Sequence, residues 1–195
     1  MTRKIINIIF FILIASKAIA SEDSVLKIGN EEAKITVKVF SSLTCPHCAT
    51  FHLNIYSKLK NQFIDKNLVK FEHHGFPLDL AALNAEKILR CEKNNQLKFQ
   101  LLSEIYKKQN KWASGSDIKK INEMLINVGE ASNLSKENMH MCLEDEKLQD
   151  IILEERINAQ KKYKIQSTPT IFINEEKYEG KHNFKSFEKY LNKIL

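Results

Sequence analysis

The sequence predicts an α/β fold in which a block of helices interrupts a small β-sheet. Residues that alternate between apolar and polar, as in strands, occur near both ends of the chain. Between them, from Leu80 to about Tyr163, apolar residues recur every three or four positions, which is typical of amphipathic helices. A Cys-x-x-Cys motif, Cys45 to Cys48, lies where an early strand changes into a helix. The motif is therefore expected at a helix N-terminus.

The first twenty residues have the pattern of a secretory signal peptide. Arg3 and Lys4 give a positive start, Ile5 to Ala15 is apolar apart from one residue, and Ala18 to Ala20 offers a cleavage site. A retained membrane anchor is the alternative, but the apolar run is shorter than the roughly 20 residues that span a bilayer. Cleavage would remove 20 of 195 residues and three positive charges, so the net charge falls from +6 to +3. We expect a soluble exported protein, localised to the periplasm.

The elements before the helical block are two or three strands and one helix. Ser24 to Ile28 is a possible first strand, and Ile35 to Phe40 is the second. Ala49 to Lys66 reads as a helix, and Leu68 to His73 as a third strand. Gly75 to Pro77 ends this strand, because proline has no N–H to donate. The helix is amphipathic, with an apolar residue at every fourth position: Phe51, Ile55, Leu59 and Phe63.

The helical block divides into five predicted helices. They cover approximately residues 80–91, 99–106, 116–129, 135–142 and 146–163. Ser116 is the expected N-cap of the third helix, and Ser135 begins the fourth.

After the block the strand pattern returns. Thr170 to Asn174 is a predicted strand, Glu175-Glu176 a turn, Lys177 to Glu179 a partner strand and Phe184 to Leu195 a final helix. Without the block, a βαβ unit is followed by a ββα unit. We therefore divide the chain into a signal peptide (1–20), the first half of the sheet domain (21–77), a helical insertion (78–163) and the second half of the sheet domain (164–195).

The Cys-Pro-His-Cys motif permits redox chemistry or metal binding. A helix N-terminus carries unpaired N–H groups and partial positive charge, which stabilise the thiolate that attacks disulfides. His52 shares a helix face with Cys48, and His73 and His74 follow each other in a strand. These histidines could complete a metal site. A surface position for His52, and one buried and one solvated histidine in the strand, are the expected alternatives.

The motif, together with a distant Thr168-Pro169 before a strand, resembles the DsbA-type thiol–disulfide oxidoreductases. These proteins have a thioredoxin fold with an inserted helical domain. The similarity covers essentially the whole mature chain and is carried by these stretches: Ala33 to Val37, Cys45 to Cys48, Phe76 to Leu78, Cys91, Trp112-Ala113, Cys142-Leu143 and Thr168 to Thr170.

The resemblance implies a role for each motif residue. Cys45, at the helix start, would be the exposed nucleophile and Cys48 the buried resolving partner. Pro46 would restrict the turn, and His47 would stabilise the Cys45 thiolate. The resemblance also implies a cis bond at Thr168-Pro169, where the backbone would bind an extended substrate segment and Pro169 would shield the cysteines from metal. Neither a metal nor a bound cofactor is expected.

The two remaining cysteines suggest a second disulfide. Four cysteines allow three pairings, and a Cys45–Cys48 pair leaves Cys91 and Cys142 for each other. One branch of the DsbA-like proteins has such a bridge. The alternatives are two buried free thiols, or a bridge that tunes the active pair from a distance.

One position departs from the family pattern. Many members carry a buried acidic residue six positions before the first cysteine, where this chain has Val39. Without that acid, proton transfer at Cys48 would be slower or use another route, and the Cys45 thiolate would be somewhat more stable.

The predicted function is oxidation of newly exported proteins that contain free cysteines. The resemblance implies a monomer that is reoxidised by a DsbB-like, quinone-linked membrane protein. Lysines are spread along the helices, so no nucleic-acid surface is expected. The rival functions are disulfide isomerase or reductase, and a metal-binding or chaperone-like module.

Overall fold

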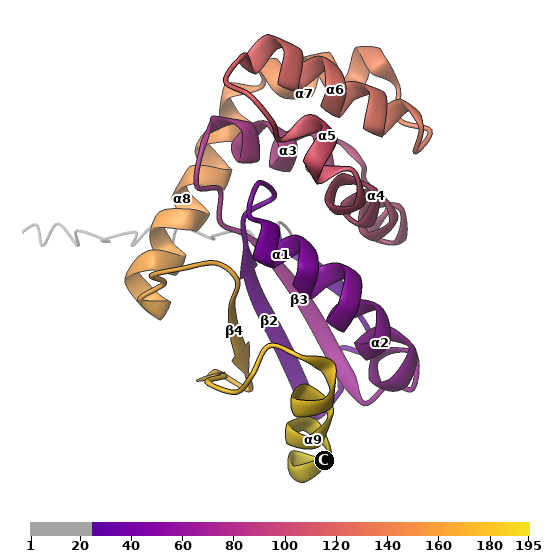
Figure 1. Cartoon of the computed structure of the whole chain (residues 1–195), viewed down its shortest axis with the longest axis vertical. Coiled ribbons are helices and arrows are strands. Elements are labelled where there is room, and N and C mark those ends of the chain that lie inside the picture. Colours follow the sequence, from indigo (N-terminus) through magenta and orange to yellow (C-terminus); the bar gives the residue numbers. More distant parts are fainter. Residues whose placement is uncertain (1–24) are drawn as a thin grey trace, which may run out of the picture.

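A mixed five-stranded sheet lies at the centre of the computed structural model, which describes residues 25–195 (Figure 1). The predicted signal peptide lies outside these residues. The strand order is β1-β3-β2-β4-β5; β2 and β3 are parallel, and the other neighbouring pairs are antiparallel. The strands are β1 (Leu26–Ile28), β2 (Ile35–Ser41), β3 (Val69–Gly75), β4 (Thr170–Ile173) and β5 (Glu176–Lys177). The predicted α/β class is confirmed.

The helix after the cysteine motif runs along one face of the sheet. It begins as α1 (Pro46–Phe51) and continues through the π-helical segment η2 (His52–Tyr56), α2 (Ser57–Leu59) and the π-helical segment η3 (Lys60–Ile64). Its four predicted apolar positions are all buried, as amphipathic spacing requires. The last helix, α9 (Phe184–Ile194), covers the same face, and the rings of Phe51 and Phe187 lie 6.1 Å apart.

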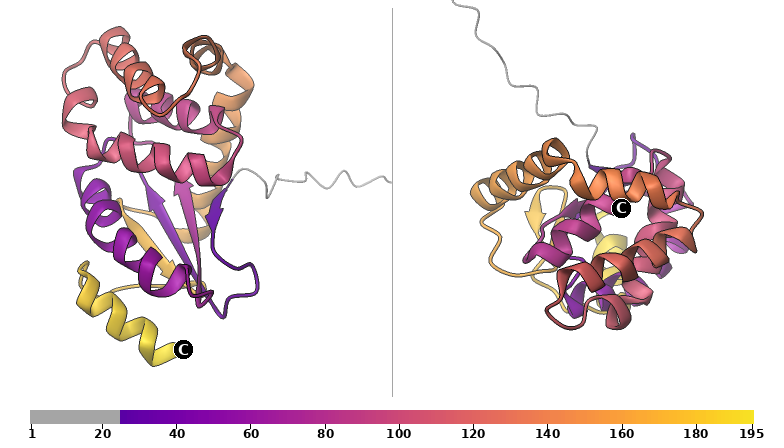
Figure 2. Two further views of the ribbon diagram at one scale, coloured as in Figure 1. Left: turned by 90° about the vertical axis from the view of Figure 1, so that its right-hand side faces the viewer. Right: turned by 90° about the horizontal axis from the view of Figure 1, so that it is seen from above.

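Six helices separate β3 from β4, and all but the last of them gather beyond one end of the sheet (Figures 1 and 2). They are α3 (Leu80–Cys91), α4 (Asn95–Lys107), α5 (Gln109–Trp112), α6 (Ile118–Glu130), α7 (Lys136–Glu144) and α8 (Glu146–Tyr163). The short α5 was not predicted. Trp112 at its end is fully buried and donates its indole N–H to the Ile105 carbonyl at 2.8 Å. Helix α8 then returns along the sheet and leads to β4 (Figure 1).

Several boundaries differ from the prediction, and two of them have a clear local cause. The N-cap of α6 is Asp117 rather than Ser116, because the Asp117 carboxylate accepts the N–H groups of two first-turn residues. The turn between β4 and β5 is Asn174-Glu175 rather than Glu175-Glu176. Both turn residues have positive φ, 49° and 68°, as a two-residue hairpin turn requires, so β5 begins at Glu176.

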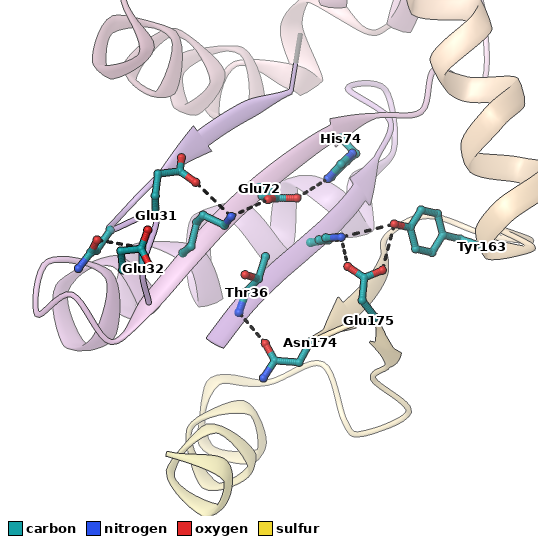
Figure 3. Close-up of polar contacts among 11 residues, drawn as sticks. Glu31, Glu32, Thr36, Glu72, His74, Tyr163, Asn174 and Glu175 are labelled. Atoms are coloured by element: carbon teal, nitrogen blue, oxygen red, sulfur yellow. Dashed lines mark hydrogen bonds and ion pairs between the residues drawn. The ribbon is translucent and has the colours of Figure 1, made fainter. Parts of the chain in front are cut away.

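The second face of the sheet is partly apolar and partly charged. Phe40, Phe76, Ile165 and Phe172 form a small cluster there. Beyond it, Lys38 pairs with Glu175, and His74 hydrogen-bonds to Glu72 at 3.0 Å (Figure 3). Burial alone would raise the pKa of Glu72, but His74, Lys38 and Lys70 stabilise the carboxylate and lower the pKa to about 2. None of the helices within residues 25–195 is long and apolar enough to cross a bilayer.

Candidate active site

The cysteine motif forms the start of α1, as the sequence predicted. Cys45 is the N-cap, in an extended conformation (φ −77°, ψ 120°), and Pro46 occupies the first turn. The Cys45 carbonyl accepts the N–H groups of Cys48 at 3.1 Å and Ala49 at 3.2 Å. The backbone N–H groups of His47 and Cys48 are also placed to stabilise negative charge on the Cys45 sulfur.

The two motif cysteines are free thiols in unequal environments. Cys45 is 9% exposed and Cys48 is 1% exposed. Cys45 is therefore the more accessible sulfur, but the prediction that it would be exposed is wrong, because the segment before β4 lies against it. Pro46 and His47, by contrast, are exposed.

That segment is Thr168-Pro169, whose peptide bond is cis. The Cys45 thiol donates to the Thr168 carbonyl oxygen at 3.3 Å, which joins parts of the chain 123 residues apart. The Thr168 hydroxyl is buried and has no partner with hydrogen-bond geometry among residues 25–195. It lies near enough to both sulfurs to favour their ionised forms. Thr168, which the family resemblance singled out in the sequence, therefore does lie next to the cysteines.

The surroundings lower the pKa of the Cys45 thiol and raise the pKa of the Cys48 thiol. A hydrogen bond from the Cys48 thiol is the main cause that lowers the pKa of Cys45 to about 5. Burial opposes this effect, and Thr168 and the helix N–H groups add to it. Burial raises the pKa of Cys48 far above its usual range, and the hydrogen bond to Cys45 and its charge raise it further. At neutral pH the site therefore holds one thiolate and one thiol.

Gln109, which the sequence analysis missed, fixes the loop before α1. Its side-chain amide donates to the carbonyls of Leu43 at 2.8 Å and Cys45 at 3.0 Å. On the other side, the Thr44 hydroxyl donates to Asp79 at 2.7 Å. No local signal identifies Gln109, because a glutamine in a helical stretch reads as an ordinary surface residue.

His182, in the loop before α9, is a second residue that the sequence did not single out. Burial lowers its pKa, Glu179 opposes this shift, and repulsion from His47 lowers the pKa further. His182 therefore brings a second imidazole into electrostatic range of the motif.

The histidines do not form a metal centre in the described part of the chain. Between residues 25 and 195, no three His, Cys, Asp or Glu side chains are arranged to hold a metal ion. His73 is buried and its Nε2 lies 3.1 Å from Glu86, while His74 points to the other face of the sheet. The expected surface position of His52 is wrong. It is 4% exposed, and Ser103 satisfies its Nε2 at 2.9 Å.

Cys91 and Cys142 form a disulfide between the end of α3 and α7. Their Cα atoms are 6.0 Å apart and 51 positions apart in sequence. At Val39, where the resemblance would place an acid, the side chain is buried in the apolar core. In the sheet, Val39 pairs with His73 on β3 and Ile171 on β4.

Known proteins share this architecture. The family model described as Thioredoxin matches residues 21–193. A protein from Rickettsia bellii, named “Putative protein-disulfide oxidoreductase”, is 30% identical over 154 residues, or 78% of this chain and 58% of that protein. Disulfide bond formation protein D of Bacillus subtilis is 27% identical over 180 residues, covering 86% of this chain and 76% of that protein. The chain thus spans little more than half of the Rickettsia protein.

Solved structures show the same similarity as the sequence relatives, to proteins of disulfide exchange. The crystal structure of Wolbachia pipientis alpha-DsbA1 superposes with a TM-score of 0.81 at 26% identity, covering 87% of this chain and 90% of that chain. The thioredoxin-like fold with inserted helices is therefore confirmed. The chain belongs to the thioredoxin family, and within it is similar to DsbA proteins.

Proposed function

We propose that this chain is an exported thiol–disulfide oxidase that donates its Cys45–Cys48 disulfide to newly exported proteins. The observation that carries this proposal is the unequal pair of thiols. Cys45 is stabilised as a thiolate, with a pKa of about 5, while Cys48 is held as a thiol. Family membership supports thiol–disulfide exchange, and the predicted signal peptide supports export to the periplasm.

The reaction consists of two exchanges. A substrate thiolate attacks the Cys45 sulfur, the Cys45–Cys48 bond breaks, and its electron pair leaves on Cys48, which takes up a proton. A second substrate thiolate then attacks the substrate sulfur of the mixed disulfide. The substrate gains a disulfide, and Cys45 leaves as a thiolate. The enzyme pair has accepted two electrons.

Ionisation of Cys45 favours this direction. A pKa of about 5 stabilises the reduced form at pH 7 by about 1.36 × 2, or about 2.7 kcal/mol. For a two-electron couple this corresponds to roughly 60 mV. Solvent at the mouth of the site screens the charge, so these values are upper limits.

The other groups have supporting roles in the proposal. The backbone at Thr168-Pro169 would pair with an extended substrate segment next to Cys45. Pro46 would restrict the turn, and the exposed His47 would help to stabilise the Cys45 thiolate. Cys91–Cys142 would be a structural bridge, and a DsbB-like quinone-linked membrane protein would reoxidise the monomeric enzyme.

Equilibration of the mature protein with glutathione buffers tests the direction. We expect the Cys45–Cys48 disulfide to be reduced under mildly reducing conditions, and the oxidised protein to oxidise a two-cysteine peptide stoichiometrically. Cys45→Ser should abolish the transfer. If the Cys45–Cys48 bond resists reduction at a glutathione redox potential like that of the cytosol, the chain is not a disulfide donor. Efficient unscrambling of ribonuclease would indicate an isomerase, and stoichiometric metal in protein purified without reductant would indicate a metal-binding module.

A further inference from the structure

An open groove lies on the helical insertion, between α5 and α6, and has a volume of about 310 Å³. Its lining residues come from the junction of α4 and α5, from α5 itself and from α6: Lys108, Lys111, Trp112, Met124, Asn127 and Val128. Most of this lining is apolar, and none of these residues has a role in the disulfide exchange described above. The groove is therefore a feature that the reaction itself does not explain.

The base of the groove is held firmly by the core of the helical block. Trp112 and Val128 are buried, and Met124 is partly buried and packs against the core. Because these side chains are already fixed, binding in the groove costs little ordering of the protein. Its volume is at the lower end of the range of about 300–1,000 Å³ for ligand sites, which suits one or two side chains of a polypeptide.

The rim of the groove carries positive charge that the protein does not balance. The Lys108 ammonium lies 3.1 Å from the Glu104 carboxylate, but Glu104 also pairs with Lys107 at 3.4 Å, so one carboxylate serves two lysines. Lys111 is exposed and has no ion-pair partner among residues 25–195, and no acidic side chain lines the groove. Such a rim around an apolar base is complementary to an occupant that combines carboxylates with an apolar side chain.

Helix α5 connects the groove to the active-site loop. Gln109 begins this helix and donates to the carbonyls of Leu43 and Cys45. Trp112 ends the same helix, one turn away, and lines the groove. Figure 1 shows α5 next to the start of α1. One side-chain length and one helical turn place the groove on the order of 10–15 Å from Cys45. An extended polypeptide covers this distance with about four residues.

We propose that the groove between α5 and α6 binds an acidic and apolar segment of the substrate polypeptide, about four residues from the substrate cysteine that reacts with Cys45. An apolar side chain enters the groove, and neighbouring carboxylates pair with Lys108 and Lys111. The Asn127 side-chain amide, exposed at the rim, hydrogen-bonds to the backbone of the segment. The nature of the partner, a protein with reactive cysteines, rests on the proposed function. The groove adds a preference among such proteins.

The tryptophan of the groove provides a readout that involves no redox reaction. Trp112 is the single tryptophan of the chain, so its emission reports on occupancy of the groove. The probe is a short peptide without cysteine or aromatic residues that contains Glu-Leu-Glu, and its matched counterpart contains Lys-Leu-Lys. Each is titrated into the oxidised mature protein. We expect the acidic peptide to bind at least about fivefold more tightly, and the difference to shrink as salt is added.

Two variants and a matched control locate the binding, and all three replace exposed residues. Lys111→Glu should reverse the preference, so that the Lys-Leu-Lys peptide binds more tightly. Asn127→Phe narrows the groove without changing the charge and should weaken the binding of the acidic peptide at least about fivefold. Lys189→Glu, on α9 at the far end of the sheet, makes the same charge change as Lys111→Glu and should keep the parent preference (Figure 1). Thermal midpoints close to that of the parent show that each variant folds.

The same preference should appear in catalysis. Two-cysteine substrates carry the Glu-Leu-Glu or the Lys-Leu-Lys segment four residues before the first cysteine or four residues after the second. In at least one of these placements the acidic substrate should be oxidised with the higher kcat/KM by the parent, and Lys111→Glu should remove this advantage.

The outcomes separate the groove from the proposed function. Equal affinity of the parent for the two peptides would overturn the proposal, as would the parent preference in Lys111→Glu. Equal oxidation of both substrates in both placements would also overturn it. A change of oligomeric state in Lys111→Glu or Asn127→Phe, measured by light scattering, would show instead that the groove is a contact between copies of the chain. If the peptides bind as expected but neither substrate is oxidised, the binding site stands and the proposed oxidase function fails.

Discussion

The low pKa of Cys45 predicts a specific pH dependence for the stability of the reduced protein. The perturbation is a change of pH from 8 to 5, compared between the parent and a Cys45→Ser variant. The folded pKa of about 5 lies below the value of about 8.5 for a cysteine in an unfolded chain. The thiolate therefore stabilises the fold fully above pH 8.5, and this contribution disappears as the pH falls through 5.

The magnitude follows from the two pKa values. Between pH 5 and 8 the contribution grows by about 1.36 kcal/mol per pH unit, which gives about 4 kcal/mol over the range. At pH 7 it is about 2.7 kcal/mol. Screening by solvent at the edge of the site lowers both values. Even half of this effect is large against a typical stability of about 5–15 kcal/mol.

Urea unfolding of both proteins under full reduction measures the effect. Subtracting the free energies of unfolding cancels the other titrating groups and the loss of the Cys91–Cys142 bridge, since both proteins share them. The difference should increase steadily from pH 5 to pH 8. A difference that stays flat over this range, or a thiolate absorbance titration with a midpoint near 8, would refute the assignment of a stabilised thiolate to Cys45.

Three further variants test other contacts of the site and the helical block. Thr168→Val should raise the pKa of the motif thiolate, since it removes a hydroxyl that favours the ionised sulfurs; an unchanged absorbance titration would contradict this role. Gln109→Ala should lower the free energy of unfolding by about 2 kcal/mol, because two hydrogen bonds to the loop before α1 are lost; urea unfolding of the oxidised protein would show it. Replacing Cys91 and Cys142 by alanine should cost about 4 kcal/mol by the loop-entropy relation, and a glutathione equilibrium that shifts as well would show that the bridge also tunes the active pair.

The sequence alone determined the local structure of this protein. The four-residue spacing of Phe51, Ile55, Leu59 and Phe63 predicted the buried face of the first helix, and all four are buried. Alternation and helical spacing come from the geometry of one element, so they can be read without knowing its neighbours. The position of the Cys-x-x-Cys motif at a helix start could be predicted for the same reason. The cis bond at Thr168-Pro169 followed only from the family resemblance, because proline at a strand start is usually trans.

Tertiary packing determined the burial, the hydrogen-bond partners and the charge states of the polar residues. Gln109 and Glu86 occupy ordinary positions in helical patterns, and nothing local distinguishes them from surface residues. His52 reads as a surface residue, yet it is buried, because Ser103 satisfies its ring nitrogen and Tyr56 stacks on it. The charge state of a thiol likewise depends on groups from distant segments, which only the packed chain brings within a few ångströms of each other.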